Sequence, residues 1–195
     1  TRKAWFLDHT LRRNDLWIGL KTLDRERLSF DLQSWEHAKP RVQINTAIQP
    51  RRGVLKPITL VPDASVVLRH HHRSESFAVE VDMGTVSTRL MKERYQAYWR
   101  WWRRGGAQQR YGPMPFRVLT LTTSMPRLER LRAIAQDAPE DGGSTALFWF
   151  ALLEDVAPEK PARLLEDIWS ISRSRKTSAQ SLFRTLNNKP HEPNP

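Results

Sequence analysis

The chain has 195 residues, which suffices for one domain with a buried core and is too short for two full domains. It contains no cysteine, so disulfides, zinc fingers and thiolate metal sites are excluded. Its 32 lysines and arginines outnumber 21 acidic residues, and the net charge of +11 favours a polyanionic partner. Nucleic acid is the leading candidate, although an acidic protein or a membrane surface would require the same charge.

No segment reaches the roughly 20 apolar residues of a membrane-spanning helix, and the first ten residues lack the apolar core of a signal peptide. We therefore expect a cytoplasmic protein with no membrane partner. The chain begins at Thr1 and not at methionine, so we also expect that an upstream portion is missing.

The first elements are predicted to be a helix and a strand. Residues 7–23 place apolar side chains at helical spacing, and Asn14 with Asp15 interrupts them, which predicts one helix with a break. Residues 28–32 alternate apolar and polar side chains, which predicts a half-buried strand near a sheet edge.

A loop and a hairpin are predicted next. Residues 39–57 combine several prolines with arginine and lysine, and this composition predicts an irregular basic loop. Residues 58–70 and 77–83 are rich in β-forming side chains and flank a polar turn, which predicts a β-hairpin.

A helix is predicted after Gly84, with Thr85 or Ser87 as its cap and its end near Arg104. Its apolar stripe consists of Val86, Leu90, Met91, Tyr95, Tyr98 and Trp102. The β-branched run 116–123 predicts a central strand that is buried on both faces.

The remaining segments predict a helix over 124–138, a strand over 144–156 and a last helix over 160–171. The helix over 124–138 has Ser124 as cap and turns Leu128, Leu131 and Ile134 inward. The order of elements predicts an α/β domain with a mixed central sheet flanked by helices over residues 1–172. Residues 173–195 form a basic, proline-containing tail that we expect to be disordered.

Three carboxylates are the main candidates for chemistry. Strand alternation turns Glu80 and Asp82 to one face of their strand, and the hairpin can bring Asp63, which follows a ladder-breaking proline, opposite Glu80. Acids this close repel one another unless a cation lies between them or they take up protons. Oxygen ligands favour Mg²⁺ or Mn²⁺, which can activate water at a phosphodiester. The alternative is that Glu80 and Asp82 form the solvent face of their strand.

Two basic clusters are candidates for nucleic-acid contact. Tryptophan and arginine alternate in residues 98–104, and this pairing suits single-stranded or distorted DNA. The residues assigned to DNA there are Trp99, Arg100, Trp101, Arg103 and Arg104, and the alternative is that Trp102 and Trp99 pack inside. Arg69 and Arg73 flank three histidines and are assigned to phosphate, because adjacent histidines point in different directions and suit a metal poorly.

The segments 60–63 and 77–85, with Glu80, Asp82 and Gly84, resemble the replication-relaxation family of plasmid and mobile-element proteins. Weaker matches follow in order: the opening segment with His9 and Asn14, the strand around Trp35, and residues 116–132. The resemblance covers most of residues 7–170. It implies a bacterial protein associated with the nucleoid or a plasmid, with a winged-helix region upstream of this chain.

The core of that family is similar to the PD-(D/E)xK restriction-endonuclease-like fold, in which a metal-binding aspartate faces an acid on the next strand. The resemblance assigns Asp63 to that aspartate and Glu80 to the second acid, with Asp82 as an auxiliary ligand or an orienting group. Asp82 stands where such nucleases have lysine. Arg94 stands where the family usually has lysine, and Arg94 or Lys92 is assigned to the scissile phosphate. The alternative for Arg94 is an ordinary ion pair on the flank of the helix.

The sequence thus predicts a DNA-binding protein of plasmid or mobile-element replication, relaxation or transfer. The resemblance allows a metal-dependent nicking activity with Mg²⁺ or Mn²⁺. One alternative is a non-catalytic module that retains a degenerate nuclease fold. Another is a structural subunit that recruits other replication or transfer proteins through its tryptophan-rich helix.

Overall fold

A mixed β-sheet forms the centre of the protein, whose computed structural model describes residues 2–27, 29–37, 44–48, 56–140, 146–172 and 179–183. Within these ranges the central sheet has the strand order β1-β4-β5-β6-β7-β8, and β2 and β3 form a separate two-stranded sheet. The elements are α1 (Arg2–Glu26), β1 (Phe30–Glu36), β2 (Ile44–Ile48), β3 (Lys56–Leu60), β4 (Ala64–His70), β5 (Arg73–Asp82), α2 (Thr88–Arg103), α3 (Gly106–Tyr111), β6 (Phe116–Thr122), α4 (Met125–Gln136), β7 (Phe148–Leu152), the 3-10 helices η1 (Leu153–Val156) and η2 (Pro161–Leu165), and β8 (Ser170–Ile171).

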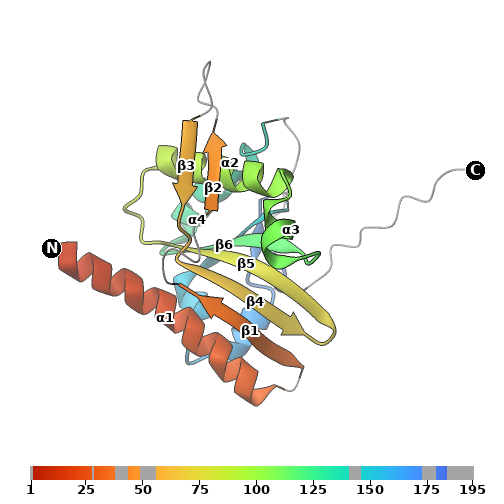
Figure 1. Cartoon of the computed structure of the whole chain (residues 1–195). Coiled ribbons are helices and arrows are strands. Elements are labelled where there is room, and N and C mark those ends of the chain that lie inside the picture. Colours follow the sequence, from red (N-terminus) through yellow and green to blue (C-terminus); the bar gives the residue numbers. More distant parts are fainter. Residues whose placement is uncertain are drawn as a thin grey trace, which may run out of the picture.

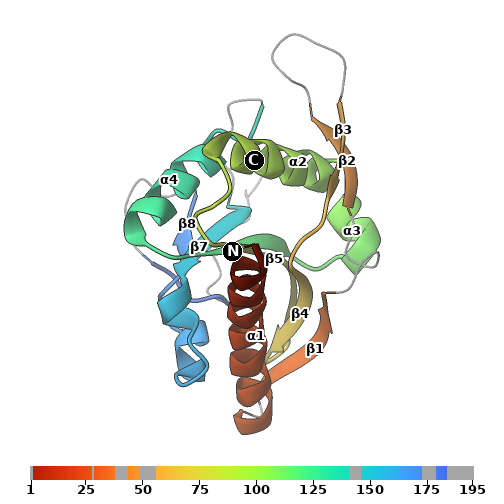
Figure 2. The same ribbon diagram turned by 90° about the vertical axis from the view of Figure 1, so that its left-hand side faces the viewer.

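Helices cover both faces of the central sheet, as Figures 1 and 2 show. On one face, α1 contributes Leu16, Leu20 and Leu23 to a buried apolar cluster with β-strand side chains. On the other face, α2 and α4 pack through a second cluster that includes Tyr95 and Leu131. The predicted class, an α/β domain with a mixed sheet flanked by helices, is confirmed. Among the described residues, no helix combines the length and the apolarity needed to cross a bilayer.

Strand β5 lies in the middle of the sheet, and this position decides where its acids go. It pairs antiparallel with β4 and parallel with β6. Phe77, Val79 and Val81 belong to the cluster under α1. Strand alternation therefore turns Glu80 and Asp82 toward the side of α2 and α4. Both acids are buried, with exposed fractions of 4% and 2%, so the solvent-face alternative for them is wrong.

Several predicted elements are confirmed with their particulars. Strand β1 lies at the sheet edge, β4 and β5 form the predicted hairpin, and β6 is buried on both faces. Helix α2 is capped by Ser87, whose side chain accepts a hydrogen bond from the Leu90 N–H. The predicted stripe on α2 is wrong at two positions, because Leu90 and Trp102 are 49% and 37% exposed.

The last turn of α2 is fixed by Trp101 and Gly106. The Trp101 ring packs edge-on against Phe116, with ring centroids 5.2 Å apart. A Cβ atom on Gly106 would lie 2.2 Å from the Trp101 Nε1 atom, so only glycine fits at the start of α3 without moving the ring. Trp101 therefore faces inward, and Trp102 lies at the surface.

Two predictions for the first part of the chain are wrong. Helix α1 is continuous from Arg2 to Glu26, because the side chains of Asn14 and Asp15 accept hydrogen bonds from neighbouring arginines and do not compete for the helix backbone. Part of the predicted loop 39–57 forms β2 and the start of β3, where Pro57 pairs with Ala47. The rest of that loop lies outside the described residues.

The predicted helix over 160–171 is also wrong. The chain there forms η2 and then β8, which pairs antiparallel with β7. The edge of β7 offers backbone partners to Ser170 and Ile171, and this pairing outweighs their helical spacing. Part of the predicted tail belongs to the packed domain, because Gln180 pairs with Trp169 and both Leu182 and Phe183 are buried. Residues 173–178 and 184–195 lie outside the described ranges.

Truncation of Leu182 tests whether this segment is part of the core. Leu182 is 1% exposed, so Leu182→Ala should lower the free energy of unfolding by about 2–5 kcal/mol, measured by urea denaturation. The control is Leu11→Ala at a position that is 51% exposed, where we expect a change below about 0.5 kcal/mol. Equally small effects at the two positions would contradict the packing of Leu182.

Candidate functional site

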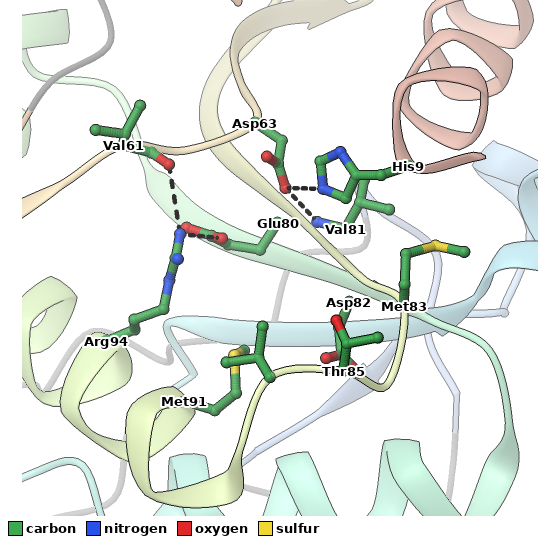
Figure 3. A pocket seen from close by; sticks show the side chains of 11 residues that line it. His9, Val61, Asp63, Glu80, Val81, Asp82, Met83, Thr85, Met91 and Arg94 are labelled. Carbon is green, nitrogen blue, oxygen red and sulfur yellow. Dashed lines mark hydrogen bonds and ion pairs between the residues drawn. The ribbon is translucent and has the colours of Figure 1, made fainter. Parts of the chain in front are cut away.

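A cavity of about 230 Å³ lies where the start of β4, the end of β5 and α2 meet (Figure 3). Its lining includes Asp63, Glu80 and Asp82, so the structure brings the three acids predicted from the sequence to one place. Arg94 of α2 and His9 of α1 complete its charged lining. We call this cavity the acid pocket.

Asp63 reaches the pocket because the chain bends after Pro62. Its backbone N–H donates to the Val79 carbonyl oxygen at 2.9 Å, which continues the hairpin ladder by one residue. Its carboxylate then turns toward β5, where Oδ2 accepts a hydrogen bond of 2.7 Å from the Val81 N–H. The side chain of Asp63 is thereby held at the rim of the pocket, 21% exposed.

His9 is a pocket residue whose role sequence reasoning missed. Its Nε2 atom lies 3.3 Å from Asp63 Oδ2, and Figure 3 shows the ring reaching from α1 toward that carboxylate. The hydrogen bond to Asp63 raises the pKa of His9, and partial burial opposes this rise. A single histidine on a helix gave no signal beyond the family resemblance, because its partner lies 54 positions further along the chain.

Glu80 is buried and accepts two short hydrogen bonds. Arg94 Nη2 lies 2.5 Å from Oε2, and the Tyr98 hydroxyl donates to Oε1 at 2.5 Å. Burial raises the pKa of Glu80, while the charge of Arg94 opposes this rise and that of Asp63 adds to it. Arg94 also points to the Val61 carbonyl oxygen at 3.4 Å. Its guanidinium therefore lies in the pocket and is not confined to the outer flank of α2.

Asp82 is held by a residue that sequence reasoning missed. Arg127 of α4 forms a two-pronged contact, with Nε 2.8 Å from Oδ2 and Nη2 2.9 Å from Oδ1. The Thr122 hydroxyl donates to Oδ2 at 2.8 Å. Arg127 Nη2 also donates to the Val86 carbonyl oxygen at 2.6 Å. No sequence spacing pointed to this pair, because it depends on how α4 packs beside β5.

These contacts test whether the pocket fits a divalent cation. Both oxygens of Glu80 and both of Asp82 already accept hydrogen bonds from cationic or hydroxyl donors. Among the described residues, no group of three or more histidine or acidic side chains is arranged to hold a metal ion. The set as arranged does not fit Mg²⁺ or Mn²⁺. The positive charge that three neighbouring acids require comes instead from Arg94 and Arg127.

Lys92, the other candidate for the scissile phosphate, is absent from the lining of the acid pocket. It is 43% exposed and its Nζ lies 3.5 Å from Asp137. Two residues along a helix correspond to more than half a turn, so Lys92 and Arg94 leave α2 on different sides. The structure therefore assigns the pocket cation to Arg94.

The tryptophan-rich end of α2 is divided between the core and the surface. Trp99 is 9% exposed, and Arg103 lies 5.8 Å from the centre of its ring. Arg100 is buried and its Nε donates to Glu140 at 2.6 Å. Trp99 and Arg100 have little exposed surface in this arrangement, so the structure lends no support to their predicted DNA contacts. Trp101 is partly buried, while Arg103 and Arg104 are exposed.

The two arginines beside the histidine run differ in their surroundings. Arg69 forms an ion pair of 2.9 Å with Asp31 of the neighbouring strand. Arg73 is exposed at the start of β5. His70 lies against Phe183, with ring centroids 4.9 Å apart, and His71 adopts a φ of 53° in the tight turn. His70 and His71 therefore serve the packing and the turn, while His72 is exposed.

All lining residues of the acid pocket lie in a part of the chain that matches a known family. Residues 1–116 match the sequence profile of the replication-relaxation family, which is more than half of the chain. The chain belongs to the replication-relaxation family. This membership connects it with the replication or relaxation of plasmids and other mobile elements. The matched segment contains His9, Asp63, Glu80 and Arg94 and ends before Arg127. No curated protein and no solved structure matches the chain.

Titration of His9 tests its contact with Asp63. Because this contact raises the pKa of His9 above 6.5, protonated His9 stabilises the folded state. The contribution of His9 to the free energy of unfolding is fully present below the pKa that His9 has in the unfolded chain. It is lost as the pH rises through the higher pKa that His9 has in the folded protein. The stability difference between the unaltered protein and His9→Gln should therefore be larger near pH 6 than near pH 8. In NMR titrations, Asp63→Asn should lower the pKa of His9, and an unchanged pKa would contradict the pairing.

Proposed function

We propose that this chain binds DNA during the replication or relaxation of a plasmid or other mobile element, and that arginine pairing makes its acid pocket a structural centre. Family membership supports the biological setting. One observation supports DNA binding above all: from Arg94 to Leu128 the chain has seven arginines and no acidic residue. Four of these arginines, Arg94, Arg100, Arg117 and Arg127, pair with acids elsewhere in the chain. The rest remain toward the surface.

The surface arginines of this segment gather around the end of α2. Arg103 and Arg104 are exposed, and Arg110 of α3 is partly exposed with its guanidinium 5.5 Å from the centre of the Tyr111 ring. Trp102 lies beside them at the surface. We call Trp102, Arg103, Arg104 and Arg110 the α2–α3 patch. Phosphate contacts dominate DNA affinity, and arginine suits them because it stays charged and presents several donors.

Removal of charge from this patch tests the proposal. The double variant Arg103→Ala with Arg104→Ala should weaken DNA binding. It should also reduce the slope of log affinity against log salt by about 0.9 for each duplex phosphate that the protein no longer neutralises. Fluorescence anisotropy between about 50 and 200 mM salt measures both quantities.

The matched control replaces two exposed arginines that already pair with acids of their own helices. Arg12 lies 3.7 Å from Asp8 and Arg89 lies 3.4 Å from Glu93. Arg12→Ala with Arg89→Ala removes the same charge, and we expect little change in the salt slope. If both double variants lowered DNA affinity equally, the effect would come from overall charge and not from the α2–α3 patch. If the affinity did not change with salt, DNA would not be the partner.

Metal-dependent nicking is the second candidate function. The observation in its favour is that Asp63, which follows Pro62, shares a cavity with Glu80 of the next strand. This is the placement that the resemblance to PD-(D/E)xK nucleases implies, and it supports an assignment of the core to that fold. Arg94 stands against the activity, because its guanidinium already neutralises Glu80 and because arginine is a poor proton carrier.

A plasmid assay separates the two candidates. Under the binding proposal, supercoiled plasmid stays supercoiled with Mg²⁺ or Mn²⁺. Under the second candidate, open circles accumulate with either metal, and Asp63→Ala and Glu80→Ala abolish them while DNA affinity is retained. Glu80→Gln serves as a control for folding, because it keeps the size of the side chain beside Arg94 and Tyr98.

The cytoplasmic location expected from the sequence is part of this proposal, as are other replication or transfer proteins as partners. Recruitment through the tryptophan-rich helix receives less support than DNA binding. Trp99 and Trp101 pack inward, so Trp102 supplies the exposed tryptophan surface of α2 in the described part of the chain.

A further inference from the structure

Two hollows on the surface share one wall, the segment 113–115 between α3 and β6. The first, which we call the arginine hollow, is lined by Arg73, Ser74, Glu75 and Arg117 together with that segment. The second, the tryptophan hollow, is lined by Trp102, Arg103 and Gln108 together with the same segment. Neither hollow includes a residue of the acid pocket. Figure 1 shows α3 and the end of the β4–β5 hairpin on the same side of the molecule.

Arg117 gives the arginine hollow a fixed cation. Its guanidinium lies 4.5 Å from the centre of the Trp149 ring, and Nη1 pairs with Glu75 and donates to the Leu182 carbonyl oxygen at 3.3 Å. Both of these polar contacts are made by Nη1. The stacked ring and the ion pair hold the guanidinium in one orientation.

The electrostatics of the arginine hollow favour an added anion. Burial, followed by the nearby charge of Arg73, lowers the pKa of Arg117 to about 10, so Arg117 remains charged at neutral pH. Glu75 offsets one of the two charges, and the three side chains together leave one positive charge. A phosphate between Arg73 and Arg117 would relieve the repulsion between them.

Trp102 gives the tryptophan hollow an aromatic surface. It is 37% exposed, unlike the inward-facing Trp99, and Arg103 lies next to it in the same hollow. The backbone around it is open, because a Cβ atom on Gly105 or Gly112 would meet nothing within 4 Å. A flat ring beside a cation is the arrangement on which proteins stack unpaired bases.

We infer that a single strand of DNA crosses residues 113–115, with a phosphate between Arg73 and Arg117 and a base stacked on Trp102. This inference rests on the proposed function and adds the form of the DNA. The bases of a duplex stack on one another inside the helix, whereas an unpaired base is free to lie flat on the Trp102 ring. Relaxation and replication both involve strands that have left the duplex.

Anisotropy with a labelled oligothymidine and with a duplex of equal length tests the inference on the full chain. Trp102→Ala should weaken single-strand binding by roughly 5- to 150-fold, the range expected when one base no longer stacks, and leave duplex affinity unchanged. Arg73→Ala should reduce the salt slope for the single strand by about 0.7. Arg117→Lys keeps the charge but removes the planar fork, and it should weaken single-strand binding while thermal unfolding shows a folded protein.

Trp17→Ala is the matched control, because Trp17 of α1 is 40% exposed and lies in neither hollow. Equal effects of Trp17→Ala and Trp102→Ala on single-strand binding, or an equal weakening of duplex binding in Trp102→Ala, would overturn the inference. Tighter binding of the matching oligouridine RNA would overturn its assignment to DNA. Duplex binding without any effect of Trp102 contradicts this inference alone, whereas absence of binding to both forms of DNA contradicts the proposed function as well.

Discussion

The buried acids of β5 are the constraint on which the rest of the structure depends. A carboxylate removed from water destabilises the fold by several kcal/mol unless a cation and hydrogen bonds replace the lost solvation. Glu80 obtains them from Arg94 and Tyr98 of α2, and Asp82 obtains them from Arg127 of α4 and Thr122 of β6. Each acid thus ties the central strand to a different helix on the same face. The positions of α2 and α4 are fixed by charge as well as by apolar packing.

The same pairs supply the positive charge that neighbouring buried acids require. A guanidinium is planar and stays charged, so it can neutralise a carboxylate with two parallel hydrogen bonds, as Arg127 does with Asp82. Lysine, which PD-(D/E)xK nucleases use, has one compact charge and exchanges protons more readily. Under the proposed function, arginine at position 94 keeps the charge balance beside Glu80 but would carry protons less readily than a lysine. This difference is the physical basis for preferring DNA binding over nicking.

The local features of the site were predictable, and the long-range ones were not. Strand alternation predicted that Glu80 and Asp82 share a face, and the hairpin together with Pro62 predicted the approach of Asp63, since these features depend on neighbours in sequence. The partners His9 and Arg127 were missed, because their contacts follow from how α1 and α4 pack on the sheet. The helix expected over 160–171 failed for a similar reason, since the edge of β7 is formed by residues far from it along the chain. Trp102 was expected to be buried because helical spacing places it on the apolar stripe of α2. The spacing does not show that the last turn of α2 extends beyond the buried core.

The close contact between Gly106 and Trp101 has a consequence for how this surface can change. Because the glycine leaves room for the indole, α3 begins directly after α2, and the aromatic side chain that meets solvent is the next one along. The exposure of Trp102 therefore depends on Gly106, a residue that has no side chain and cannot itself contact a ligand through one. If this surface binds DNA as proposed, substitution of a surface arginine would remove one charge, whereas loss of Gly106 would displace the Trp101 ring beneath the surface.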